Sequence, residues 1–342
     1  MNKPFFTRTI IILPDDTKKP IVDAIEAAKK SIKIKMFVFS DPDLINAVIE
    51  AKKRGIEVQV MLNPSRRSGE DDNGDTRKML EDAGIDVKDS NPAFGLTHEK
   101  SMVIDEATAF IKSLNWATKN LTITRDYAVT TNHKHEVDEI ITCFTADWNR
   151  TEFSPGEHAH MIWCTGNGRD RIARFIDEAK HKLFVQNERY QDPVIIERLV
   201  RAAMRGVKVH VMARPPHTLK KDKLVEAVGG LRIMDDVGIK IHTLRHLKLH
   251  GKMLIADGSR AIVGSINLAP GSFDDRRELA IEVHDEDVVE RLHQIAHEDW
   301  KNSHPLDLSD AGLFADLEEK GEGGDENLAL NIKKKDKHEE DD

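Results

Sequence analysis

The residues that could do chemistry occur in two sets with the same spacing. His98 is followed two positions later by Lys100, and His250 is followed two positions later by Lys252. Each set continues with an aspartate, a serine, an asparagine and a second carboxylate at the same distances from its histidine. These residues are Asp105, Ser113, Asn115 and Asp126 in the first set and Asp257, Ser265, Asn267 and Glu278 in the second. Buried lysines and carboxylates are costly unless they are paired, so packing alone does not explain two matched sets.

The residue types in each set suit chemistry on a phosphate. Ammonium, hydroxyl and amide groups can bind its non-bridging oxygens. If the two sets face each other, one imidazole can attack phosphorus while the other protonates the departing oxygen. A carboxylate behind each imidazole would fix its tautomer, and Asp126 and Glu278 are placed to do so, with Asp126 expected behind His98. The predicted catalytic residues are His98, His250, Lys100, Lys252, Asp126 and Glu278, and the predicted phosphate ligands are Lys100, Lys252, Asn115, Asn267, Ser113 and Ser265.

The segments that must position these residues form one unit written twice. Asp41-Pro42 aligns with Asp192-Pro193, 151 positions further along the chain, and Asp147-Trp148 aligns with Asp299-Trp300 at an offset of 152. Such self-similarity is the signature of an internal duplication. Two like halves could also be explained by the burial of a shared core face, so the duplication by itself indicates fold rather than chemistry.

Each half shows the same alternation of helical and strand patterns. An amphipathic helix is expected at about 20–30 and 169–181, an apolar strand at 32–39 and 183–189, and a second helix at 43–54 and 194–205. Further strands follow, and the His and Lys of each set are expected on one face of a single strand. The pattern predicts an α/β fold of two tandem halves, with helices flanking the sheets, and if the halves face each other across a pseudo-twofold axis their two sets converge at the interface.

Composition and charge set the expected domain boundaries. The 342 residues carry a net charge of −9, most of which falls after residue 305, where Asp and Glu greatly outnumber Lys. We expect a first half at 1–155, a second half at 156–304 and an acidic, disordered tail at 305–342 that could bind a partner. The remaining body is nearly neutral, so bulk charge neither favours nor excludes a polyanionic substrate.

Cysteine content and hydropathy indicate a cytoplasmic protein. The two cysteines, Cys143 and Cys164, cannot build a disulfide framework and fit a reducing compartment. No stretch reaches the ~20 apolar residues of a membrane span, so only peripheral membrane contact is expected. The 16 histidines are scattered, and no metal site is expected.

The doubled pattern His-x-Lys-x4-Asp followed by Ser-x-Asn resembles the phospholipase D superfamily over about residues 20–303. The resemblance implies two α/β halves around a shared site that needs no metal or cofactor and that works through a covalent phosphohistidine. It also implies that His98 is the nucleophile and that His250 is the general acid. Asp105 and Asp257 resemble local ion-pair partners more than catalysts.

The first half departs from the superfamily pattern at two positions. Lys112 stands where the pattern has Gly, as Gly264 does in the second half, and a lysine there could change the floor of the pocket. Asp126 stands where a glutamate is expected and is one methylene shorter, so its hydrogen bond to His98 could be lost. These departures leave open a phosphate-binding scaffold without catalysis.

The resemblance does not separate the possible substrates. The arrangement of two motifs in one chain is most similar to the cardiolipin synthase and phospholipase D-like branch. We therefore expect a phosphodiesterase or phosphatidyl transferase acting on phospholipid, with a nuclease acting on DNA or RNA as the alternative. The body has no strong basic stripe, which does not favour nucleic acid.

Overall fold

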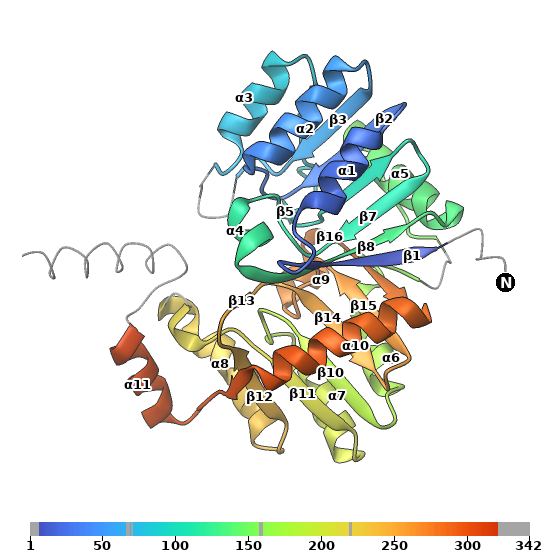
Figure 1. Ribbon diagram of the computed structural model, residues 1–342. Coiled ribbons are helices and arrows are strands. Elements are labelled where there is room, and N and C mark those ends of the chain that lie inside the picture. Colours follow the sequence, from blue (N-terminus) through green and yellow to red (C-terminus); the bar gives the residue numbers. More distant parts are fainter. Residues whose placement is uncertain (1–6, 66–68, 70, 157–159, 219–220, 321–342) are drawn as a thin grey trace, which may run out of the picture.

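The computed structural model describes residues 7–65, 69, 71–156, 160–218 and 221–320. The first half of the chain builds one mixed sheet with its helices (Figure 1). Its elements are β1 (Arg8–Leu13), α1 (Lys19–Ala27), β2 (Ser31–Met36), α2 (Pro42–Lys53), β3 (Glu57–Leu62), α3 (Gly74–Asp82), β4 (Asp86–Asp89), β5 (Leu96–Thr97), β6 (Ser101–Ile104), β7 (Thr108–Lys112), α4 (Thr118–Thr122), β8 (Thr124–Thr131) and α5 (Lys134–Asn149).

The second half repeats this series. Its elements are β9 (Met161–Cys164), α6 (Gly168–Asp177), β10 (Lys182–Gln186), α7 (Pro193–Met204), β11 (Lys208–Met212), the 3-10 turn η1 (Pro216–Thr218), α8 (Lys221–Asp235), β12 (Lys240–Leu244), β13 (Lys248–Leu249), β14 (Lys252–Ala256), β15 (Arg260–Gly264), α9 (Pro270–Asp274), β16 (Arg276–Val283), α10 (Glu286–Lys301), β17 (Ser303–Pro305) and α11 (Asp310–Lys320).

The two sheets have the same strand order. The first runs β1-β8-β7-β6-β2-β3-β4, and the second runs β9-β16-β15-β14-β10-β11-β12, with β17 added at its far edge. In each, two parallel pairings connect three strands, as in β2-β3-β4, and the other pairings along this order are antiparallel. The predicted α/β fold of two tandem halves is confirmed.

The repeated Asp-Pro pair starts the same helix in both halves. The Asp41 side chain accepts a hydrogen bond from the backbone N–H of Leu44 at the start of α2, and Asp192 accepts one from Ile195 at the start of α7. The proline that follows each aspartate occupies the first helical turn, where its missing N–H costs nothing. The motif is therefore a helix start and not part of the site.

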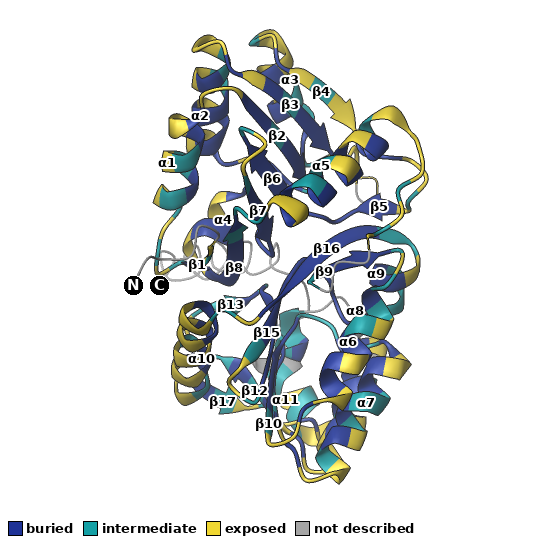
Figure 2. Ribbon diagram, turned by 90° about the vertical axis from the view of Figure 1, so that its right-hand side faces the viewer, coloured by how far each residue is buried: buried dark blue, intermediate teal, exposed yellow. Residues whose placement is uncertain are grey.

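A shared core joins the halves. Figure 2 shows the first half above the second, with the strands of both sheets coloured as buried. The core at the interface contains side chains of both sheets, among them Ile111 and Val129 of the first half and Val263 and Ile281 of the second. Side chains of α5 and α10 complete it. Separate apolar cores lie on the other face of each sheet, under α1 and α2 and under α6 and α7.

The prediction of a disordered tail is wrong for residues 305–320. Leu308 is buried in the core of the second half, and the α11 residue Asp316 accepts hydrogen bonds from the backbone and imidazole of His217. Arg232 of α8 pairs with Asp310. Apolar contacts and ion pairs thus hold a segment whose composition alone indicated disorder, while residues 321–342 lie outside the described residues.

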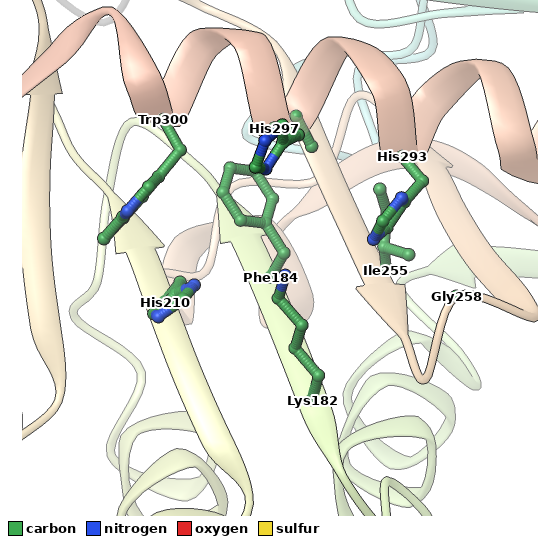
Figure 3. Close-up of a pocket in the computed structure, with 9 residues that line it drawn as sticks. Lys182, Phe184, His210, Ile255, Gly258, His293, His297 and Trp300 are labelled. Carbon is green, nitrogen blue, oxygen red and sulfur yellow. The ribbon is translucent and has the colours of Figure 1, made fainter.

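The last helix of each half packs differently on its sheet. In the first half Phe144 stacks on Trp148, with ring centroids 5.6 Å apart. The equivalent of Phe144 in the second half is Ala296, and a cavity of about 150 Å³ lies there between α10 and the sheet (Figure 3). Trp300 stacks on His210 and His242 beside it. The cavity lies at the far end of the sheet from the motif histidine: His250 precedes the start of β14, whereas Ile255, near the end of β14, lines the cavity.

Candidate active site

Each histidine of the two motifs lies in a break between two strands. His98 falls between β5 and β6, and His250 between β13 and β14. The prediction of one continuous strand is therefore wrong. The short strands β5 and β13 leave their own half: β5 pairs with β16 of the second half, and β13 pairs with β8 of the first. The break lets each histidine reach into the interface.

The carboxylates that support the imidazoles are exchanged between the halves. Nδ1 of His98 lies 2.9 Å from Oε2 of Glu278, and Nδ1 of His250 lies 2.8 Å from Oδ1 of Asp126. The expectation that Asp126 stands behind His98 is wrong. The reason is that β13 pairs with β8, the strand that carries Asp126, and β5 pairs with β16, the strand that carries Glu278. The shorter Asp126 forms its hydrogen bond without loss.

An arginine beside each carboxylate joins the strand that carries the carboxylate to a helix of the other half. Arg125 precedes Asp126 and pairs with Asp299 of α10 at 2.9 Å, and Arg277 precedes Glu278 and pairs with Asp147 of α5 at 3.0 Å. The carbonyl oxygens of the same two arginines accept the backbone N–H groups of Gly251 and Glu99, next to the histidines. These pairs use the repeated Asp-Trp positions, whose role the sequence did not reveal.

The imidazoles and lysines of both halves act on one another electrostatically. Burial, together with the charges of Lys100, Lys252, Arg276 and His250, lowers the pKa of His98 well below its usual range. His98 is therefore a neutral ring at neutral pH. Since a carboxylate occupies each Nδ1, Nε2 is the nitrogen that remains for chemistry on either ring.

The two lysines of the motifs turn back toward the histidine backbone. Lys100 donates to the carbonyl of His98, and Lys252 donates to the carbonyl of His250. Burial and the charge of Lys252 lower the pKa of Lys100 to about 7. An ammonium has three N–H donors, so both lysines keep capacity for a ligand.

Asn115 and Asn267 occupy equivalent buried positions after β7 and β15. Their carboxamide oxygens have no hydrogen-bond partner within the described part of the chain. Polar atoms that are buried without a partner are uncommon in folded proteins and often mark a ligand site. Phosphate binding by these two asparagines stays a prediction.

The two serines have a different place from the one predicted. Oγ of Ser113 donates to Asp126 at 2.6 Å and accepts the backbone N–H of Tyr127. Oγ of Ser265 accepts the backbone N–H of Leu279 at 3.1 Å. Both side chains are fully buried. They hold the strands that carry the carboxylates, and this geometry does not fit direct binding of phosphate.

Asp105 and Asp257 organise turns. The carboxylate of Asp105 accepts the backbone N–H groups of Lys29, Lys30 and Ser31, and Asp257 does the same with Lys180, His181 and Lys182. These bonds lower the pKa of both carboxyl groups against the opposing effect of burial. The structural role expected for them is realised through backbone hydrogen bonds rather than through ion pairs.

Lys112 lies in the core of the first half. Its side-chain nitrogen is fully buried over the ring of Trp116, 4.7 Å from the centroid, and has no hydrogen-bond partner among the described residues. Burial lowers the pKa of Lys112 well below its usual range. The expected change to the pocket floor is thus a neutral amine packed against an indole.

Glu188 is a site residue that the search for motifs missed. Oε2 of Glu188 lies 2.6 Å from Nζ of Lys252 and 3.8 Å from Nε2 of His250, and Oε1 lies 3.1 Å from Arg214. The equivalent residue of the first half is Phe37, whose ring contacts His98 edge-on at 4.9 Å. The alignment of the two repeats places Glu188 opposite Phe37, so the sequence marks this position by a difference between the halves and not by a matched residue.

One group of possible metal ligands occurs among the described residues, and it is an ion-pair network. Glu99, Cys143 and Asp147 come together, but Nζ of Lys35 lies 2.8 Å from Glu99 and 2.7 Å from Asp147. Arg277 supplies a second cation to Asp147. The carboxylates are committed to these internal cations, so the donor set does not fit a metal ion.

Within the described ranges, the structure contains no helix with the length and apolar character needed to cross a membrane.

Comparison with known proteins identifies the family. The family model described as "Cardiolipin synthase, PLD-like domain" matches residues 21–148 and again residues 172–300. Polyphosphate kinase 1 of Chlorobaculum tepidum is 25% identical, over 87% of this chain and 43% of its own length. Cardiolipin synthase B of Salmonella typhimurium is 25% identical, over 78% of this chain and 73% of its own length. The chain thus spans less than half of the first of these relatives.

Solved structures show the same fold. A phosphatidylserine synthase of Haemophilus influenzae Rd KW20 superposes with a TM-score of 0.68 at 14% identity and covers 87% of both chains. The two family matches together span well over half of the chain and coincide with its two structural repeats. The chain therefore belongs to the phospholipase D superfamily, in the family described as cardiolipin synthase, PLD-like domain.

Proposed function

We propose that this protein transfers or hydrolyses phosphodiesters through a covalent phosphohistidine, with phospholipid as its substrate. The observation that carries the proposal is the exchange of carboxylates: two imidazoles from opposite halves, each held at Nδ1 by the other half, with a buried lysine beside each. This arrangement supplies a nucleophile, an acid and two cations for one phosphate.

The environments of the two rings support different roles for them. His98 is neutral because burial and nearby cations lower its pKa, and a neutral imidazole has a lone pair for attack. His250 has the Asp126 carboxylate 2.8 Å from Nδ1 and the Glu188 carboxylate 3.8 Å from Nε2, so it is the ring that faces two carboxylates, and we assign it the role of general acid. In the proposed first step Nε2 of His98 bonds to phosphorus, the bond to the leaving oxygen breaks, and His250 gives that oxygen its proton.

The second step reverses these movements. An alcohol or water gives its proton to His250 and attacks phosphorus, and the bond between phosphorus and His98 breaks. The family description and the similarity to a cardiolipin synthase support phospholipid as the donor and an alcohol as the acceptor. The similarity to a polyphosphate kinase supports a different acceptor, a phosphate chain.

Two alanine variants test the mechanism on bis(p-nitrophenyl) phosphate in the presence of EDTA. Turnover by the unmodified protein should survive the chelator, and His98→Ala and His250→Ala should each abolish it, whereas His246→Ala, at an exposed position, should not. Because p-nitrophenol leaves without protonation, His250→Ala should still form a phosphoenzyme that His98→Ala cannot form. A phosphoenzyme in His98→Ala alone would exchange the two roles, and loss of all activity with EDTA would contradict the proposal.

Substrate class is tested with the unmodified protein. Phospholipid vesicles with a primary alcohol should give phosphatidyl alcohol, and single- and double-stranded DNA should remain intact. Nicked or degraded DNA with unchanged lipid would contradict the phospholipid proposal and support a nuclease.

A further inference from the structure

The two histidines of the site have different neighbouring side chains. Phe37 of the first half and Glu188 of the second occupy equivalent positions, 151 residues apart, just after the strands β2 and β10 end at Met36 and Gln186. Phe37 contacts His98 and lies 5.2 Å from the ammonium of Lys100. Glu188 instead contacts Lys252 and faces His250. The site is thus apolar beside His98 and anionic beside His250.

Glu188 is held in this place as a carboxylate. Burial would raise its pKa, but Lys252, His250 and Arg214 together lower it well below its usual range. Arg214 follows β11, and its equivalent in the first half is Asn63, which is uncharged. The carboxylate and the arginine that holds it therefore belong to the second half alone.

The two lysines of the motifs differ in how many of their N–H groups are already hydrogen-bonded. Lys252 donates to the carbonyl of His250 and to Glu188, which leaves one of its three N–H groups for a phosphate oxygen. Among the described residues, Lys100 donates a hydrogen bond to the carbonyl of His98 alone, which leaves two of its N–H groups. A phosphate bound here would therefore meet more free N–H groups on Lys100 than on Lys252, and Glu188 lies beside Nε2 of His250.

We propose that Glu188 binds the acceptor, and that the acceptor is an alcohol carrying a further hydrogen-bond donor, a second hydroxyl or an ammonium, rather than a phosphate. This inference rests on the proposed function. In the second step the acceptor hydroxyl gives its proton to Nε2 of His250 while its oxygen attacks phosphorus and the bond to His98 breaks. Glu188 stays ionised and accepts a hydrogen bond from the second donor group, which orients the attacking oxygen.

The same carboxylate opposes an anionic acceptor. A phosphate chain bound next to His250 would bring its charge against Glu188 in a largely buried site, where like charges repel strongly. The geometry thus separates the two acceptors that the relatives suggest. It favours the alcohol.

The test measures how the phosphoenzyme divides between water and competing acceptors. The full chain is given bis(p-nitrophenyl) phosphate with glycerol, ethanolamine or glycerol 3-phosphate, and the p-nitrophenyl phosphodiester products are compared with p-nitrophenyl phosphate. Glu188→Gln, which keeps the shape and removes the charge, is compared with Glu282→Gln, a buried carboxylate of the second half that pairs with Arg171. A ratio of products does not depend on how much of a variant is folded, so a purely structural role would leave it unchanged.

We expect the unmodified protein to prefer glycerol and ethanolamine over glycerol 3-phosphate, and Glu188→Gln to reduce this preference about tenfold, the effect of losing one charge-assisted hydrogen bond. Glu282→Gln should leave the ratios unchanged. Equal use of glycerol 3-phosphate by the unmodified protein, or unchanged ratios in Glu188→Gln, would overturn the inference while leaving the proposed function intact. If Glu188→Gln does not fold, the preference of the unmodified protein still decides. Absence of any turnover by the unmodified protein would instead contradict the proposed function.

Discussion

Lys100 and Lys252 occupy equivalent positions and meet different charges. Lys252 has the Glu188 carboxylate at 2.6 Å, whereas Lys100 has the ring of Phe37. Without a carboxylate partner, burial and the charge of Lys252 lower the pKa of Lys100 to about 7. The ammonium that we propose as a phosphate ligand is therefore itself a titrating group near neutral pH.

This pKa predicts a fall in activity as the pH rises. Lys100 is charged below about pH 7 and loses its charge above it, so kcat/KM should fall by about tenfold between pH 6 and pH 8. In Lys100→Arg the charge persists and the fall in this range should disappear. The measurement is a profile of kcat/KM against pH, with Lys182→Arg, outside the site, as a control that should keep the fall. A fall that persists unchanged in Lys100→Arg would show that another group titrates.

Single residues of the site were predicted from the sequence to the extent that they repeat. The matched spacings found both histidines, both lysines and both carboxylates, because each of these residue types recurs at the same position in both halves of the duplicated chain. Glu188 and Arg214 were missed for the same reason, since each differs from its equivalent, Phe37 or Asn63. The pairing of Asp126 with His250 depends on contacts between the halves, which no spacing along the chain reveals.

At the scale of elements, β7 and β15 end differently. Gly264 ends β15, and a side chain there would collide with Ala280, at 2.4 Å from its Cα. The equivalent of Gly264 is Lys112, which ends β7 and turns its amine into the core under Trp116. The two strands are otherwise alike in register, so the first half accommodates a buried lysine at a position where the second has no room for any side chain.

Replacing this lysine should stabilise the protein. Lys112→Met keeps the apolar stem and removes an unpartnered buried amine, so the free energy of unfolding at pH 7 should rise by about 1–3 kcal/mol. The unfolded chain binds a proton at Lys112 up to its usual pKa of 10.5 and the folded chain does not, so the stability of the unmodified protein rises with pH toward 10.5. The advantage of Lys112→Met should therefore shrink toward pH 10.5.

The measurement is denaturant unfolding across this pH range. Lys119→Met, at an exposed position, serves as the control and should change stability by less than about 0.5 kcal/mol. If Lys112→Met is less stable than the unmodified protein at pH 7, the amine has a stabilising contact and its burial is not a cost.

Over the whole molecule, two buried ion pairs join the halves with unequal strength. Asp147 meets both Lys35 and Arg277, and these cations lower its pKa to about 2 against the effect of burial. Asp299 meets one cation, Arg125, and the amide of Gln186, and burial raises its pKa. The carboxylate of Asp147 is the better compensated of the two.

The difference predicts which aspartate stabilises the interface more. Asp147→Asn should lower the free energy of unfolding by about 3–5 kcal/mol at neutral pH, as expected when a buried pair loses one partner, and Asp299→Asn should cost less. The pH-dependent contribution of Asp147 is present above its ordinary pKa of 3.8 and is lost as the pH falls from there through about 2, so the cost of Asp147→Asn should shrink by about 2 kcal/mol in that window. Unfolding curves of both variants between pH 2 and pH 7 measure this. An equal cost for the two variants, or a cost for Asp147→Asn that is undiminished at pH 2, would contradict it.

The fold of each half was more predictable from the sequence than the contacts that join the two halves and hold the segment 305–320. Alternating apolar strand patterns and amphipathic helix patterns predicted each half, because those signals are local. The segment 305–320 was misjudged because its order depends on Leu308 and Asp316 meeting distant residues of the second half. The exchange of β5 and β13 was equally invisible, since each is two residues long and carries no pattern of its own.

The exchange of carboxylates has a consequence for the descent of the chain. After a gene duplication, two copies are ordinarily free to accumulate differences separately. Here a mutation at Asp126 alters the histidine of the opposite copy, and a mutation at Glu278 alters the histidine of the first. Neither copy can change alone, because the length of the carboxylate in one copy, aspartate or glutamate, sets the support of the histidine in the other.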